Sequence, residues 1–182
     1  MMKKNILLGV CGGIAAYKTC ELTRLLVKDG FDVKVVMTDA ARRFIGPLVF
    51  QTLSNNPVYL DMFTLIREES PRHIDLAQWA GLCVVAPLSA NTLSKIAGGT
   101  CDNLLTTVIC ALPRETKVLC APAMNDCMWK NPLIVQNVAK LTKLKKYVVM
   151  TPATGQLACG VYGEGRMPEP VVIYKKIKDI VR

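Results

Sequence analysis

The sequence predicts one α/β domain built on a parallel sheet with helices on both faces. Short apolar runs typical of strands alternate along the chain with amphipathic segments of helical length, which is the pattern of βαβ units. With 182 residues, of which 51% are hydrophobic and 20% charged, the chain is long enough and apolar enough for one core. No internal repeat, low-complexity tract or linker divides it, so residues 1–182 are expected to form a single domain.

The first strand is predicted at residues 5–10, and an amphipathic helix follows from about residue 14 to residue 29, where Gly30 ends it. The other strands are predicted at residues 32–37, 82–86, 117–121 and 146–151, and the other helices near 39–54, 74–80, 90–112 and 131–143. This order indicates a Rossmann-like sheet of the flavodoxin type. Such sheets bind ligands beyond the carboxyl ends of their strands, so functional residues are expected there.

The segment from about 152 to 169 is rich in glycine and proline and is too long for a plain connection, which predicts a flexible C-terminal flap over a substrate. It contains Cys159, which has no helical or strand context to bury it. A cysteine on such a loop can reach a substrate and withdraw, as a proton donor delivered by closure would. The alternative is an incidental thiol on a disordered loop.

No run of about 18 or more uncharged apolar residues occurs, so no membrane span is expected. The apolar start at residues 5–10 is short and lacks a small-residue cleavage site, which favours a strand over a signal peptide and a cytoplasmic location for the protein. The 8 cysteines include no Cys-x-x-Cys pair, which argues against a zinc site, and an intracellular protein is not expected to use disulfides. Apart from Cys159, most are expected to be small buried hydrophobes.

Lys and Arg outnumber Asp and Glu by 23 to 14, which gives a net charge of +9. Nucleic-acid binding is one explanation of such an excess. The basic residues are scattered along expected solvent-facing helices, however, and no basic run is interleaved with aromatic residues. A small substrate that carries phosphate is therefore favoured over a nucleic acid.

Paired glycines, Gly12 and Gly13, follow the first predicted strand. They let the backbone turn sharply and approach a ligand, and the helix that follows presents unpaired N–H groups to an anion. The spacing is neither that of a dinucleotide-binding motif nor that of a P-loop. The segment is therefore either a phosphate site or an ordinary turn between a strand and a helix.

Polar side chains follow the third predicted strand, where Ser89, Asn91 and Thr92 stand at the start of a helix. Helix capping explains one of the three comfortably, but not all of them. This cluster is expected to meet the loop that contains Gly12 and Gly13, the glycine loop, across the sheet. The two together indicate a ligand with both phosphate and hydrogen-bonding groups, and flavin mononucleotide (FMN) fits that description.

The fourth predicted strand is followed by Asn125, with Met128 and Trp129 close behind. An asparagine at a strand end can hold a carboxylate or an amide by directed hydrogen bonds, whereas the methionine and tryptophan form either an apolar wall or part of the core. His73 is the only histidine of the chain and falls where a loop enters a helix on the expected ligand side. A lone histidine of this kind is either structural or catalytic.

Taken together, these segments resemble the homo-oligomeric flavin-containing cysteine decarboxylases. The Ala158-Cys159-Gly160 segment is most similar to the branch of the family that converts phosphopantothenoylcysteine to phosphopantetheine in coenzyme A biosynthesis. In many bacteria that domain is fused to a synthetase, so the chain is either a stand-alone enzyme or one domain of a bifunctional protein. The matching segments occur in the family's order and span nearly the whole chain: residues 12–18, the segment around His73, and residues 86–93, 101–105, 122–125, 128–129 and 157–160.

The resemblance implies that FMN oxidises the substrate to a thioaldehyde, that the electrons released with CO2 collect as an enethiolate, and that the reduced flavin then returns the hydride. It implies that Asn125 grips the substrate carboxylate and that Cys159 donates the final proton. His73 would serve the oxidative half, either as a base or as an electrostatic partner of the thiolate. Further substrate contacts are implied for Met124, Met128 and Ala158, and flavin contacts for Gly12, Gly13, Ile14, Thr38, Ser89, Ala90, Asn91, Thr92 and Ala123.

In this family the site lies between the subunits of a homotrimer, often assembled into a homododecamer, so a homo-oligomer is implied. Two alternatives stay open. A peptide-modifying relative that oxidatively decarboxylates a peptidyl cysteine would need His73 and Asn125 but not Cys159. A non-catalytic FMN-binding regulatory subunit on the same fold can lack the histidine or carry long acidic tails, and this chain does neither.

Overall fold

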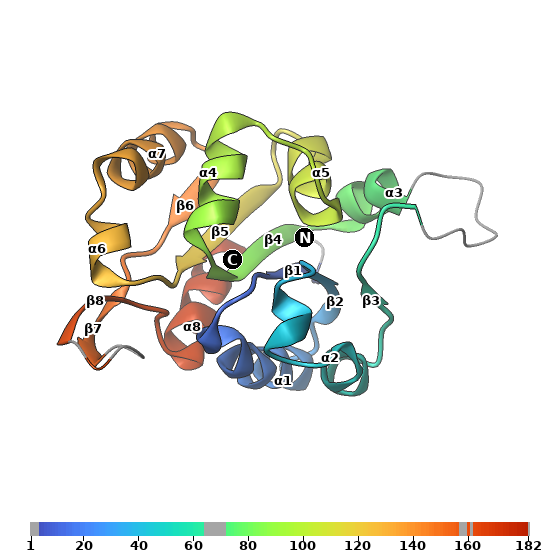
Figure 1. Cartoon of the computed structure of the whole chain (residues 1–182). Coiled ribbons are helices and arrows are strands. Elements are labelled where there is room, and N and C mark those ends of the chain that lie inside the picture. Colours follow the sequence, from blue (N-terminus) through green and yellow to red (C-terminus); the bar gives the residue numbers. More distant parts are fainter. Residues whose placement is uncertain (1–3, 64–71, 157–159, 161, 182) are drawn as a thin grey trace.

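Six parallel strands form the central sheet of the computed structural model, which describes residues 4–63, 72–156, 160 and 162–181 (Figure 1). The strand order is β3-β2-β1-β4-β5-β6, which confirms the predicted Rossmann-like class. At the centre, Ile6 pairs with Val33 on one side and with Leu82 on the other. In chain order the strands are β1 (Asn5–Val10), β2 (Asp32–Met37), β3 (Val58–Tyr59), β4 (Leu82–Leu88), β5 (Lys117–Pro122) and β6 (Tyr147–Val149).

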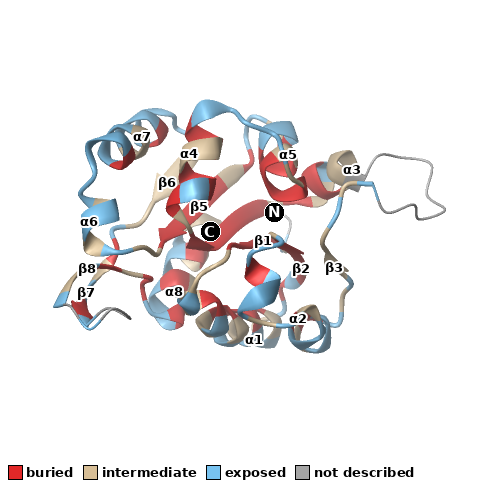
Figure 2. Ribbon diagram, in the orientation of Figure 1, coloured by how far each residue is buried: buried red, intermediate tan, exposed pale blue. Residues whose placement is uncertain are grey.

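Helices cover both faces of the sheet, and each face has its own cluster of buried apolar residues. Figure 2 shows the central strands buried between helices whose outer sides are exposed. Among the described residues, no helix is both long and apolar enough to cross a bilayer. One layer consists of α1 (Lys18–Lys28), α2 (Pro47–Ser54) and α8 (Pro170–Val181), and the other of α3 (Arg72–Trp79), α4 (Ala90–Gly98), α5 (Leu104–Ala111) and α7 (Pro132–Lys143).

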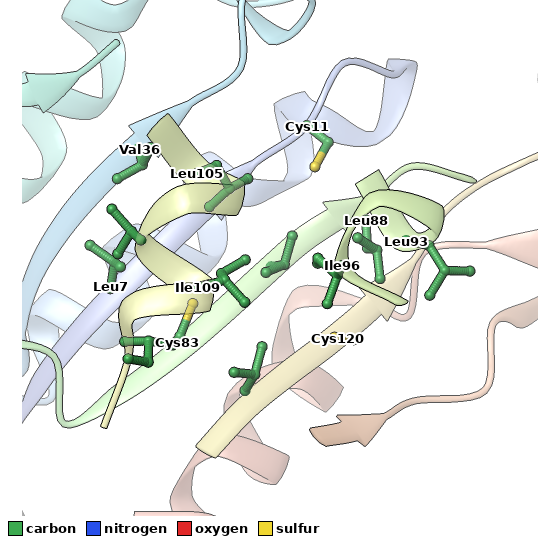
Figure 3. Packing of buried hydrophobic residues seen from close by; sticks show 14 of the residues in the cluster. Leu7, Cys11, Val36, Cys83, Leu88, Leu93, Ile96, Leu105, Ile109 and Cys120 are labelled. Carbon is green, nitrogen blue, oxygen red and sulfur yellow. The ribbon is translucent and has the colours of Figure 1, made fainter. Parts of the chain in front are cut away.

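Strand β4 is buried on both faces along its whole length. A parallel strand that is covered on both sides forms a continuous apolar run, which makes its sequence signal clear. The close approach of α5 to β1 depends on Gly9, where an added Cβ would stand 2.5 Å from Leu105 Cδ1. Figure 3 shows Leu105 and Ile109 of α5 on the face of the sheet that also carries Leu7 and Cys83.

The direction in which the chain winds across the sheet reverses between β1 and β4. From β1 the chain moves outward through β2 to β3, and it then returns to the centre to add β4, β5 and β6 on the other side. The chain segments at the ends of β1 and β4 stay joined at their bases, because the Cys11 N–H donates to the Pro87 carbonyl oxygen at 3.3 Å. A crevice for ligands opens at such a point, beyond the ends of the two strands.

The flap predicted for residues 152–169 contains a two-stranded antiparallel sheet. β7 (Ala153–Gln156) pairs with β8 (Tyr162–Arg166), and Gly155 lies opposite Gly163. The predicted flap thus contains regular strand pairing, which the sequence does not predict. The pattern gives no strand signal here because glycine is depleted in strands and offers no side chain to the alternation.

Three predicted helices have different bounds in the structure. The segment 90–112 forms two helices, since Gly99 takes a left-handed backbone (φ 72°) and Asn103 caps a new helix by accepting from the Thr106 N–H. The first helix of the chain begins as a 3-10 turn, η1 (Ile14–Tyr17). The segment 39–54 is likewise divided, into η2 (Ala41–Arg43) and α2, while no element is predicted where α8 lies.

Cysteine burial departs in part from the prediction. Burial raises the pKa of the Cys83 thiol to about 12, so this thiol stays protonated at neutral pH. The exposed cysteines contradict the expectation that most thiols serve as buried hydrophobes. The seven described cysteines are free: Cys11, Cys83 and Cys120 are buried, Cys20 is half-buried, and Cys101, Cys110 and Cys127 are exposed.

An ion pair ties the C-terminal helix to the end of α1, where the Lys178 ammonium donates to the Asp29 carboxylate. This contact holds the pKa of Asp29 below its usual value. A carboxyl group of this kind stabilises the fold above its unfolded pKa of about 4 and loses that contribution as the pH falls through the lower folded pKa. We therefore expect Lys178→Met to lower the urea midpoint at pH 7 and to have a smaller effect at about pH 3. An equal loss at both pH values would assign the effect to packing of Lys178 over the Phe31 and Tyr174 rings instead.

Candidate active site

The loop after β1 packs closely against the loop after β2. At Gly12 an added Cβ would stand 2.5 Å from the Ala40 Cβ and 2.8 Å from the Ala40 carbonyl carbon, so the position requires glycine. At Gly13, in contrast, an added Cβ would meet no atom of the described chain within 4 Å. Thr38 is half-buried at the end of β2, and its hydroxyl oxygen accepts from the Ala41 N–H at 3.3 Å. The loop therefore rests on the loop after β2 through Gly12 and faces open space at Gly13.

The loop after β4 meets the glycine loop at the point where the sheet reverses. Ser89 caps α4, since its Oγ accepts from the Thr92 N–H at 3.3 Å. Thr92 and Ala90 are buried, whereas Asn91 is exposed. The Cys11 thiol lies beneath this turn, where burial raises its pKa although the Thr92 and Ser89 hydroxyls hydrogen-bond to it. The two loops predicted to share a ligand are therefore in contact.

A cavity of about 610 Å³ opens between the glycine loop and the loop after β5. This volume lies in the range of small-molecule binding sites. The flap hairpin closes a third side, so segments far apart in the sequence form one wall. The lining residues are Gly13, Ile14, Ala15, Tyr17 and Lys18 from the first segment, Ala123, Met124 and Asn125 from the second, Gln156, Gly165 and Arg166 from the hairpin, and Met167 directly after it.

Two cations in this wall share one carboxylate. The Lys18 ammonium lies 2.6 Å from Glu169 Oε1, and Arg166 Nη2 lies 3.3 Å from the same oxygen. The Lys18 side chain is only 15% exposed. Because one carboxylate balances two cations, this part of the wall carries a net positive charge. An anionic ligand is therefore favoured here.

Asn125 stands at the start of a short helix, α6 (Asp126–Trp129). Its Oδ1 accepts from the Cys127 N–H at 2.8 Å, which is an N-terminal cap of the helix. The cap fixes the orientation of the side chain, whose NH2 group is of the kind that donates to a carboxylate. Asn125 therefore lies at the cavity wall with its side-chain orientation fixed by the cap.

His73 lies away from this cavity within one chain. It occupies the first turn of α3, which packs on α5, whereas α6 packs against β8 and α7. In Figure 1, α6 lies at the left of the molecule beside α7, whereas α3 lies at the right beside α5. A single chain therefore does not bring His73 and Asn125 together.

The structure groups the predicted site residues in three sets. Gly13, Ile14, Ala123, Met124 and Asn125 line the cavity. Outside the cavity wall lie Met128, which is 47% exposed, His73, and residues of the loops after β1, β2 and β4. Ala158 and Cys159 lie outside the described residues. The loop residues are Gly12, Thr38, Ser89, Ala90, Asn91 and Thr92.

Among the wall residues without a predicted role are Lys18, Gln156, Arg166 and Met167. Lys18 lies one helical turn after Ile14 and therefore on the same face of the helix. Because Ile14 is a predicted site residue, that spacing could have identified Lys18 as a second one. The other three belong to the hairpin and the segment after it. Whether their side chains face the cavity depends on the pairing of β7 with β8, which no pattern in the sequence predicts.

The chain is 45% identical over 181 residues to a protein of Streptococcus mutans named probable phosphopantothenoylcysteine decarboxylase, and the match covers 98% of this chain and 99% of that protein. It is 46% identical over 175 residues to the coenzyme A biosynthesis bifunctional protein CoaBC of Bacillus subtilis, with 94% of this chain covered. The chain spans only 42% of the length of that bifunctional relative.

Two solved structures share the fold over almost the whole chain. A mutant PPC decarboxylase complexed with pantothenoylaminoethenethiol has a TM-score of 0.85 and 36% identity, with 97% of each chain covered. The FMN binding protein AtHal3 has a TM-score of 0.81 and 36% identity, with 96% of this chain and 94% of that chain covered. The family model described as Flavoprotein matches residues 1–182. With that match and a full-length relative at 45% identity, the chain belongs to the flavoprotein family.

Proposed function

We propose that this chain is an FMN-dependent decarboxylase that converts phosphopantothenoylcysteine to phosphopantetheine in coenzyme A biosynthesis. The observation that carries the proposal is the 45% identity to the Streptococcus mutans relative over nearly the full length of both chains. The cavity supports it, because Asn125 and two cations, Lys18 and Arg166, line one space. A substrate with a carboxylate at one end and a phosphate at the other matches such a wall.

The residues of the crevice fit an FMN. Gly13 leaves open space beside the backbone, and Gly12 lets the loop pack against the loop after β2. We infer that Gly12, Gly13, Ile14 and Thr38 hold the phosphate end of the cofactor. Ser89, Ala90, Asn91, Thr92 and Ala123 would then flank the rest of it. When bound, the flavin supplies a reversible two-electron acceptor, which a decarboxylation without net redox change requires.

The side chains of the chain itself would orient the substrate and move its protons. Asn125 would hold the carboxylate that leaves as CO2, with Met124, Met128 and Ala158 against the neighbouring carbon atoms. His73 would assist removal of the thiol-side proton in the oxidative half. Cys159 would return a proton to carbon after CO2 has left, which completes phosphopantetheine.

We further propose that the site is shared between subunits of a homotrimer, itself able to form a dodecamer. The separation of His73 from the cavity within one chain supports this, since a neighbouring subunit can supply the missing side chain. The exposed apolar side chains at the cavity also support it, because Ile14 is 62% and Tyr17 59% exposed in the single chain. A cytoplasmic location is proposed as well, supported by free thiols in all seven described cysteines and by relatives of coenzyme A biosynthesis.

The purified protein is expected to carry FMN and to form CO2 and phosphopantetheine in equal amounts from phosphopantothenoylcysteine. Heat release of the chromophore followed by mass spectrometry identifies the flavin, and we expect FMN because the loop after β1 lacks a dinucleotide motif. Phosphopantetheine, which has no carboxylate to lose, serves as the control ligand. Recovery of FAD would refute the cofactor assignment, and an enethiol product formed only from cysteine-ending peptides would favour the peptide-modifying alternative.

A further inference from the structure

We propose that Asp126 is a positioning residue, which attaches the Asn125 loop to strand β8 and so places Asn125 against the substrate carboxylate. The inference rests on the proposed function of Asn125 and adds a residue to it. Asp126 lies outside the cavity wall, so its effect on the substrate would be exerted through its neighbour.

Strand β8 is attached to the loop on both sides of Asn125. On one side the Met124 N–H donates to the Gly165 carbonyl oxygen at 2.9 Å. On the other, Asp126 Oδ1 accepts from the Glu164 N–H at 2.9 Å. Asn125 is the one residue between these two attachments, so its backbone position is tied to that of the strand.

The glycines of β8 make this close contact possible. At Gly165 the backbone has a φ of 141°, and an added Cβ would stand 2.1 Å from the Met124 carbonyl oxygen. At Gly163 an added Cβ would stand 3.0 Å from the carboxylate carbon of Asp126. The strand therefore presents bare backbone to the loop at both places, which indicates a fitted contact rather than a chance approach.

Asp126 is suited to this attachment because it is charged and partly shielded. Its side chain is 21% exposed, and Lys130 Nζ lies 2.9 Å from the Oδ1 atom that accepts from Glu164. Hydrogen bonds to Lys130 and to the Glu164 N–H hold the pKa of Asp126 below its usual value. A backbone N–H bonds more strongly to a carboxylate than to a neutral acceptor.

The Asn125 cap alone would not place the amide in the cavity. The bond from the Cys127 N–H orients Asn125 relative to α6, which is only four residues long. The Asp126 bond connects that short helix to the hairpin that forms the opposite part of the wall. Removing the carboxylate is therefore expected to leave the cap intact and to loosen its position relative to the cavity.

The test compares two ligands that differ by one carboxylate. In the photoreduced, oxygen-free holoenzyme the flavin cannot oxidise a substrate, so equilibrium binding of phosphopantothenoylcysteine and of phosphopantetheine can be measured by calorimetry. We expect Asp126→Ala to weaken binding of phosphopantothenoylcysteine by about tenfold and to leave phosphopantetheine binding unchanged. Asn125→Ala should do the same, and the double variant should lose little more, because the two residues act on one contact.

Two matched variants and one measurement without ligand complete the test. Asp126→Asn keeps an oxygen acceptor and Lys130→Met keeps the Asp126 carboxylate, so both should bind phosphopantothenoylcysteine within about threefold of the unmodified protein. Amide hydrogen exchange at Glu164 should be faster in Asp126→Ala but not in Asn125→Ala. The inference would be overturned if Asp126→Ala weakened binding of both ligands equally or weakened binding of neither. If the unmodified protein does not distinguish the two ligands, the proposed role of Asn125 fails instead.

Discussion

A chain with His73 replaced by asparagine is expected to release CO2 from phosphopantothenoylcysteine about 10²–10⁴ times more slowly than the unmodified protein, which is the usual loss for an acid–base group. His73 is partly buried in the first turn of α3, where asparagine is well tolerated by a helix. The variant should therefore remain folded, oligomeric and yellow. Stopped-flow measurement of flavin bleaching and a CO2 assay check the prediction, and turnover near the normal rate would make His73 a structural residue.

The same variant tests whether the site is shared between subunits. Asn125→Asp should be equally inactive, because a second carboxylate would repel that of the substrate. When the two inactive proteins are unfolded together and refolded as mixed trimers, about one quarter of the shared sites should combine an intact His73 with an intact Asn125. Activity should then return to about that fraction. A site contained within one chain would give no recovery.

Replacing Cys159 with serine is expected to separate the two halves of the reaction. The variant should still bleach the flavin and release one equivalent of CO2, because the proposed mechanism assigns these steps to His73 and Asn125. It should then stall, since a serine hydroxyl is a far weaker acid than a thiol and protonates carbon poorly. Anaerobic mixing with phosphopantothenoylcysteine, followed by product analysis, should show little phosphopantetheine and a fall in overall turnover of about 10²-fold or more.

The matched control is Cys110→Ser, which changes an exposed cysteine on α5 and should turn over normally. If Cys159→Ser forms phosphopantetheine at the normal rate, another group supplies the proton. If it fails to bleach the flavin, Cys159 belongs to the oxidative half or to the fold.

The central sheet was predictable because β1, β4 and β5 are buried along nearly their whole length and carry unbroken apolar runs. The strands predicted at 5–10 and 32–37 agree with β1 and β2 residue for residue. The edge strand β3 has only two residues, which is too short for any periodic signal. The break between α4 and α5 depends on Gly99 and on the Asn103 cap, local features that a continuous helical periodicity conceals.

The candidate site was predictable only where a functional residue lies close in the sequence to the strand that positions it. Asn125 stands three residues after the end of a buried strand, β5, so the residue type and its place at the sheet edge are visible together in the sequence. The contact between Lys18 and Glu169 joins positions 151 residues apart, and no pattern at either position announces the other. The separation of His73 from the cavity depends on how α3 and α5 pack, which becomes visible only in three dimensions.

The reversal of winding between β1 and β4 also determines when the crevice can first exist. Ile6 pairs with Leu82, and all of β2, α2, β3 and α3 lie between these partners in the chain. At a translation rate of about 5–20 residues per second, the glycine loop is synthesised roughly 4–15 seconds before the strand that completes its neighbourhood. During that interval β1 can pair with β2, but the second wall of the flavin crevice has not been made. Flavin is therefore expected to bind only after β4 has been synthesised. Nascent chains halted before Leu82 should not retain flavin.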